Sequence, residues 1–254
     1  MYKRREVIDK LKPFLVNQTK ILSIWEGGSA ATNALDEFSD LDLLLVAEKE
    51  DIEVLFQIID AFFEAQFGII ESMRMHEPTW HGFAQKFYLL NHTEPWFYVD
   101  LCILPKTIED RFTAVDRHGN AVVWKDSIGF VHSEKTACDV IDNRVRVFYK
   151  RAIEGAFVLR LEVKKALHRN CYLDAYQFLY GFVMRHLVIL MNIEHRKEKV
   201  DFGIRYAQRD YSKEDYELLM QFLKASTIED IGIVSKALFK RFDVLKDKYA
   251  TLNI

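Results

Sequence analysis

Gly27-Gly28-Ser29, followed after ten residues by Asp40-Leu41-Asp42-Leu43-Leu44-Leu45-Val46, is the stretch that decides the fold. In a β-strand, residues i and i+2 point to the same face and lie about 7 Å apart. Asp40 and Asp42 therefore aim at one spot. Carboxylate oxygens are the ligands that Mg²⁺ prefers, and paired ions can hold the attacking and leaving oxygens of a phosphoryl displacement. The stretch predicts a strand with a divalent-metal site at its N-terminal end.

A glycine turn stands in front of this strand. Gly27 and Gly28 allow the backbone to turn sharply and to approach a ligand closely. We predict that Ser29 caps a short helix, whose first N–H groups would face phosphate oxygens. The alternative is an ordinary Gly-Gly-Ser turn, with Asp40 and Asp42 only solvating the entry of a strand.

A third acid, Asp100, lies inside the apolar run from Trp96 to Leu104, which reads as a buried strand. A buried ionised carboxylate costs several kcal/mol unless it is paired or binds a metal. The run contains no basic residue, so the partner must come from elsewhere. Two partners are open: a metal shared with Asp40 and Asp42, or a distant Arg or Lys.

These residues together resemble the pattern of the nucleotidyltransferase superfamily: Gly-Ser, a spacer of similar length, Asp-x-Asp and a third carboxylate on a later strand. The matching positions are Gly28-Ser29, Asp40-Leu41-Asp42 and Asp100, and the resemblance covers under half of the chain. It implies that the three acids are catalytic and hold two Mg²⁺ ions. It also implies that Gly27, Gly28 and Ser29 bind the triphosphate of ATP or another nucleoside triphosphate.

The overall plan resembles that of the bacterial antibiotic nucleotidyltransferases, which join such a domain to a helical bundle and modify aminoglycosides or lincosamides. The resemblance implies transfer of AMP from ATP to a hydroxyl of a small molecule, and it is compatible with a homodimer. In some of these relatives a carboxylate of the helical domain accepts the hydroxyl proton. Asp174 is a candidate for that role, although no spacing selects it over Glu162 or Asp139. Two alternatives are an acceptor that is a protein or tRNA, and an inactive nucleotide-binding or regulatory protein.

Composition limits the partners. With 50% hydrophobic residues among 254, the chain should be globular. A formal charge of −3 argues against a nucleic-acid partner bound chiefly through its phosphates. No apolar stretch reaches the about 18 residues of a membrane span, and no apolar signal core follows the basic start. The odd, widely spaced cysteines indicate reduced thiols. We expect a cytoplasmic protein that partners no membrane.

Periodicity predicts an α+β domain over residues 1–125, with a mixed sheet and covering helices, followed by an all-α bundle over 126–254. The first helix should be bent or interrupted by Pro13. Leu173 to Ile193 is apolar nearly all round, as in a central bundle helix. His195 to Lys199 reads as a solvated connection. The expected elements of the first domain are a helix at 4–17, strands at 20–25 and 41–46, a helix around 55–63, and a hairpin of 85–91 with 96–104.

Overall fold

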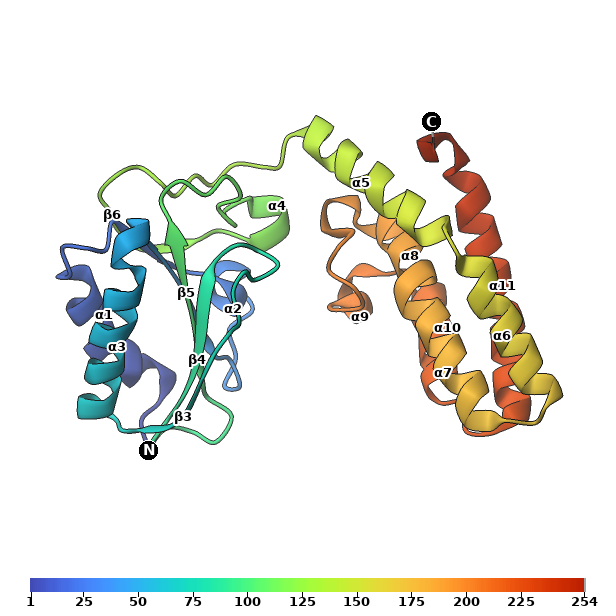
Figure 1. The fold of residues 1–254 in the computed structure, drawn as a ribbon, viewed down its shortest axis with the longest axis horizontal. Helices are drawn as coiled ribbons and strands as arrows, with labels where there is room; N and C mark the ends of the chain where they lie inside the picture. The colour runs from blue at the N-terminus through green and yellow to red at the C-terminus, as the bar shows by residue number, and fades with distance from the viewer. Residues whose placement is uncertain (254) are drawn as a thin grey trace. The chain divides into compact units, whose positions relative to one another are not determined.

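The computed structural model describes residues 1–253, which divide into two compact units, one from Met1 to Thr136 and one that begins at Ala137. The first unit is a mixed sheet with helices and the second is built from helices, as the sequence predicts (Figure 1). Among the described residues, no helix combines the length and apolar character needed to cross a bilayer.

The sheet of the first unit has six strands in the order β3-β4-β5-β2-β1-β6. Only β2 and β5 pair in parallel, and the other neighbours are antiparallel. The predicted hairpin is β4 with β5, and β3 and β6 were not predicted as strands. The bounds are β1 Ser23–Glu26, β2 Leu41–Ala47, β3 Ile69–Arg74, β4 Ala84–Leu90, β5 Val99–Pro105 and β6 Val122–Asp126.

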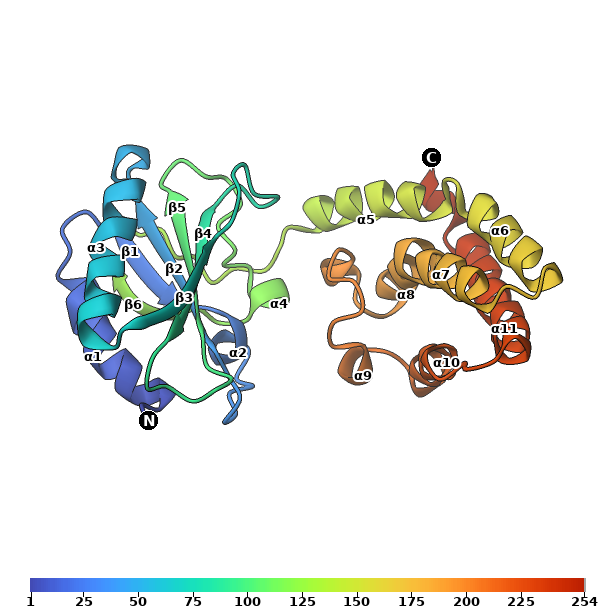
Figure 2. The ribbon, with the colours of Figure 1, turned by 60° about the horizontal axis from the view of Figure 1, so that its bottom comes forward.

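Helices α1 (Arg4–Val16) and α3 (Ile52–Gln66) cover one face of the sheet, as Figures 1 and 2 both show. Each buries an apolar stripe at helical spacing against the strands. Pro13 does not end α1, which continues to Val16, so the expected interruption is wrong. The stripes are Val7, Leu11 and Leu15 on α1, and Leu55, Ile59 and Phe63 on α3.

The other face of the sheet carries a smaller apolar cluster and two four-residue helices, α2 (Gly28–Ala31) and α4 (Val115–His118). The cluster includes Trp25, Val46 and Leu104. Asp42 on β2 and Asp100 on β5 are partly exposed.

The two units meet between Thr136 and Ala137, eleven residues beyond the expected boundary of 125/126. Strand β6 continues to Asp126 and pairs with β1, so the sheet extends past residue 125. The segment after β6 is bonded to the first unit as well, since Asp116 accepts hydrogen bonds from the N–H and hydroxyl of Thr136.

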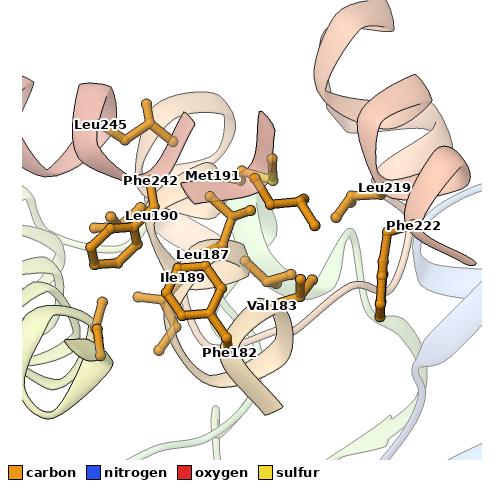
Figure 3. Packing of buried hydrophobic residues seen from close by; sticks show 14 of the residues in the cluster. Phe182, Val183, Leu187, Ile189, Leu190, Met191, Leu219, Phe222, Phe242 and Leu245 are labelled. Carbon is orange, nitrogen blue, oxygen red and sulfur yellow. The ribbon is translucent and has the colours of Figure 1, made fainter. Parts of the chain in front are cut away.

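The second unit surrounds a continuous central helix. Helix α7 passes through a π-helical turn (Val183–Leu187) into α8, and most apolar side chains of this segment are buried, as predicted (Figure 3). The helices are α5 Cys138–Ile153, α6 Ala156–His168, α7 Tyr172–Phe182, α8 Val188–His195, α9 Ala207–Asp210, α10 Lys213–Leu223 and α11 Ile228–Lys248, with 3₁₀ turns at Lys197–Lys199 and Ala250–Asn253. A further 3₁₀ turn, Lys49–Asp51, belongs to the first unit and precedes α3.

The connection after α8 is not the solvated segment that its charges predict. Arg196 is 4% exposed, and its guanidinium donates to the carbonyls of Arg205 and Gly203 and to the carboxylate of Asp210. Its Nε also donates to the side chain of the buried Asn192 at 2.8 Å. Arg196 is therefore a structural residue that fixes the loop leading to α9.

Candidate active site

The three predicted acids meet on the sheet face that α1 and α3 leave uncovered. Asp42 lies directly opposite Asp100 in the parallel register of β2 and β5, and neighbouring strands lie about 4.8 Å apart. Asp40 stands just before β2, two residues from Asp42, and so shares its face. Leu41 and Leu43 point the other way and are fully buried in the main core of the unit.

The glycine turn packs directly against one of these acids. Gly28 has φ +52°, and a Cβ built on it would lie 1.7 Å from Oδ2 of Asp42. The N–H of Gly27 donates to the backbone carbonyl of Asp42 at 3.0 Å. A side chain at position 28 would therefore displace the Asp42 carboxylate, and only glycine lets the turn and the acid approach this closely.

Ser29 does not cap the helix, contrary to the prediction. Helix α2 begins at Gly28 with Gly27 as its N-cap, because its first hydrogen bonds run from the N–H groups of Ala31 and Thr32 to the carbonyls of Gly27 and Gly28. Ser29 thus lies in the first turn. Its Oγ is shielded from solvent and has no hydrogen-bond partner within residues 1–253. A buried hydroxyl without a hydrogen-bond partner costs free energy unless a ligand supplies that partner.

Two side chains that the sequence analysis missed engage the acids. The hydroxyl of Tyr98 donates to the carboxylate of Asp40, and burial together with this bond raises the pKa of Tyr98. The amide Nε2 of Gln85 donates to both oxygens of Asp100, at 2.8 and 3.0 Å. Tyr98 could have been found by strand periodicity, since it stands two residues before Asp100. Gln85 required the register of β4 against β5.

The environment of Asp100 shifts the pKa of its carboxyl upward. Burial raises the pKa of its carboxyl, the hydrogen bond from Gln85 lowers it, and the nearby charge of Asp40 raises it again, with a net upward shift. Across residues 1–253, no group of three or more His, Cys, Asp and Glu side chains has the arrangement of a metal site. The bonds from Tyr98 and Gln85 hold two of the acids instead. The metal site expected from the spacing stays a prediction.

An ion pair between Arg4 and Glu26 supports the site. Arg4, at the start of α1, pairs with Glu26, the last residue of β1 before the glycine turn, and its Nε donates to the carbonyl of Asp40 at 2.9 Å. Burial lowers the pKa of the Arg4 guanidinium, while the charges of Asp42 and Asp40 raise it. Arg4 therefore ties the turn and the start of β2 to one helix.

The remaining candidate, Asp174, belongs to the second unit. It is exposed in the first turn of α7, whose N-cap is Cys171. Its part in any proton transfer stays a prediction.

Comparisons with known proteins leave the family open. No protein-family model matches the chain, and no curated protein matches it. Among solved structures, one that resembles it is described as a nucleotidyltransferase-like protein from Exiguobacterium sibiricum. The alignment has 12% sequence identity and a TM-score of 0.40, and it covers 98% of this chain and 75% of the other. A superposition of that quality carries no argument about function.

Proposed function

We propose that this chain is a metal-dependent nucleotidyltransferase that moves a nucleoside monophosphate, AMP from ATP, onto a hydroxyl of a small molecule. The contact between Gly28 and the Asp42 carboxylate carries the proposal, because it joins a turn suited to phosphate to an acid suited to a cation. The adjacency of Asp42 and Asp100 in the sheet supports it.

The residues present fit both a triphosphate and Mg²⁺. The unpartnered Oγ of Ser29 and the glycine cradle beside Asp42 are features that a bound phosphate would complete. Asp40, Asp42 and Asp100 are hard oxygen donors on one face of the sheet and would hold the metal. When bound, Mg²⁺ would neutralise the triphosphate and stabilise the charge that develops on the leaving pyrophosphate.

The chain's own residues would bind and orient the triphosphate and would accept the proton of the acceptor hydroxyl. The hydroxyl of Ser29 would donate to a phosphate oxygen and orient the triphosphate. Asp100 would take the proton of the acceptor hydroxyl on a carboxylate oxygen, a role suited to an acid whose pKa is raised by burial. The acceptor oxygen then forms a bond to the α-phosphorus, and the bond to pyrophosphate breaks.

The proposed class of acceptor rests on the net charge of the chain. The formal charge of −3 favours a small molecule over tRNA, because tRNA binding relies on neutralising phosphates. The resemblance to the antibiotic nucleotidyltransferases makes hydroxyl-rich compounds such as aminoglycosides the first acceptors to screen.

Calorimetric titration with non-hydrolysable nucleoside triphosphates, with and without MgCl₂, tests the proposal. We expect magnesium-dependent binding that an Asp40→Asn/Asp42→Asn protein lacks and that an Asp9→Asn protein keeps, since Asp9 is exposed on α1. Release of pyrophosphate from ATP in the presence of an acceptor panel would then identify the acceptor. Equal binding by the double variant and the wild type would refute the proposed site.

A further inference from the structure

A line of hydrogen bonds runs from the backbone to Asp100 through two side chains. The turn before β4 places His81 so that its Nδ1 lies 3.0 Å from the N–H of Phe83. Nε2 of the same ring lies 3.1 Å from Oε1 of Gln85. Gln85 in turn donates from Nε2 to both oxygens of Asp100. All three side chains are partly buried, so competition from water is reduced.

The direction of every bond in this line is set by its first member. A backbone N–H can only donate, so the bond from Phe83 makes Nδ1 of His81 an acceptor without a proton. Oγ1 of Thr79 also lies 3.2 Å from Nδ1, while its own hydroxyl donates to the carbonyl of Phe83. The neutral ring then bears its proton on Nε2 and donates to the Gln85 carbonyl oxygen. With its oxygen held by His81, Gln85 presents only its NH₂ group to Asp100. The reversed amide would set a carbonyl oxygen against the carboxylate.

We infer that His81 and Gln85 are positioning residues of the candidate site, which fix the orientation of the Asp100 carboxylate beside Asp42. The inference rests on the nucleotidyl transfer proposed above. Neither residue needs to touch substrate, since both act through Asp100. Outer residues that orient metal ligands are typically worth about 10–100-fold in metal affinity or activity.

The hydrogen bonds themselves can be tested without any assumption about function. Two-bond ¹H–¹⁵N spectra of the histidine rings report which nitrogen carries the proton. We expect His81 as the Nε2–H tautomer in the wild-type protein, and a shifted Nε2 signal in Gln85→Met. The control Gln57→Met makes the same change at an exposed glutamine of α3 and should leave the His81 signals in place.

The positioning role is tested by magnesium-dependent binding of an ATP analogue with a methylene bridge between its α- and β-phosphates. We expect Gln85→Met to weaken binding about 10–100-fold, and Gln57→Met to leave it unchanged. Two substitutions at position 81 separate orientation from packing, because the His81 ring also lies 4.6 Å from that of Phe83. His81→Gln keeps an N–H for Gln85 and should retain binding, whereas His81→Phe keeps the packing and should lose it.

Each failure has its own signature. An Nδ1–H tautomer, or His81 signals that ignore Gln85→Met, overturns the inference whether or not the nucleotide binds. Better binding by His81→Phe than by His81→Gln also overturns it, because packing would then be the role of the ring. A wild-type protein that shows the expected spectra but binds no triphosphate with magnesium refutes the proposed function and leaves His81 and Gln85 with no site to position.

Discussion

Gly28→Ala is the substitution that most directly tests how the glycine turn and the acids fit together. The native φ of +52° is strained for any residue with a Cβ, at a cost of about 1–2 kcal/mol. In addition, the new methyl would lie 1.7 Å from Oδ2 of Asp42, and overpacking of this kind costs about 1–3 kcal/mol. We expect the free energy of unfolding of the first unit to fall by about 2–5 kcal/mol.

Gly129→Ala is the matched control. Gly129 lies in the same unit with φ +63°, but nothing lies within 4 Å of its added Cβ. Gly129→Ala should therefore cost only the conformational part, about 1–2 kcal/mol, and should not affect triphosphate binding. Urea unfolding followed by tryptophan fluorescence reports on this unit, because all four tryptophans precede residue 137.

The difference between the two variants measures the contact with Asp42. We expect Gly28→Ala to be the less stable and to lose magnesium-dependent binding of the ATP analogue. Equal stability of the two proteins, together with normal binding by Gly28→Ala, would refute the assigned contact between the turn and the carboxylate.

Three further predictions concern other charged groups. Arg4→Met should lower the free energy of unfolding by about 3–5 kcal/mol, since it leaves the buried Glu26 carboxylate uncompensated. Adding Glu26→Gln to this variant should restore much of the lost stability, as measured by urea unfolding of the double-mutant cycle. Additive effects of the two substitutions would argue against the pair. Asp42→Asn should reduce nucleotidyl transfer about 10³-fold with an unchanged melting temperature, because the lost charge acts in the transition state; a fully active variant would contradict its assigned role. Asp215 is buried, which raises its pKa, but the bonds and charges of Arg241 and His195 together outweigh burial and lower it. Its contribution to the free energy of unfolding is therefore complete above the unfolded pKa of about 3.9 and is lost as pH falls below that value. Unfolding followed by circular dichroism between pH 7 and 3 should therefore show a smaller loss of stability with falling pH in Asp215→Asn than in the wild type.

Much of the fold could be read from local patterns. The stripes of α1 and α3, the strand after Asp42, the hairpin that carries Asp100 and the apolar central helix all follow from spacing along the chain, because burial selects residues at periods of 3.6 and 2. Strand β3 was missed since most of its side chains are exposed, which leaves no alternation to detect. The charged segment around Arg196 misled for a different reason, because its guanidinium is buried and donates to the carbonyls of Gly203 and Arg205 in the loop that folds back on it.

The acids that could form a site, and the glycine turn that precedes them, can be recognised from the sequence alone. Their recognition depends only on residue type and on spacing within one strand. That Asp42 and Asp100 stand side by side follows from the tertiary structure alone, since it depends on the parallel register of β2 and β5, which α3, β3 and β4 separate along the chain. The tertiary structure also decided the partners of the acids. Gln85, His81 and Arg4 reach the site through pairing and packing across the unit, and no local pattern encodes contacts between such distant positions.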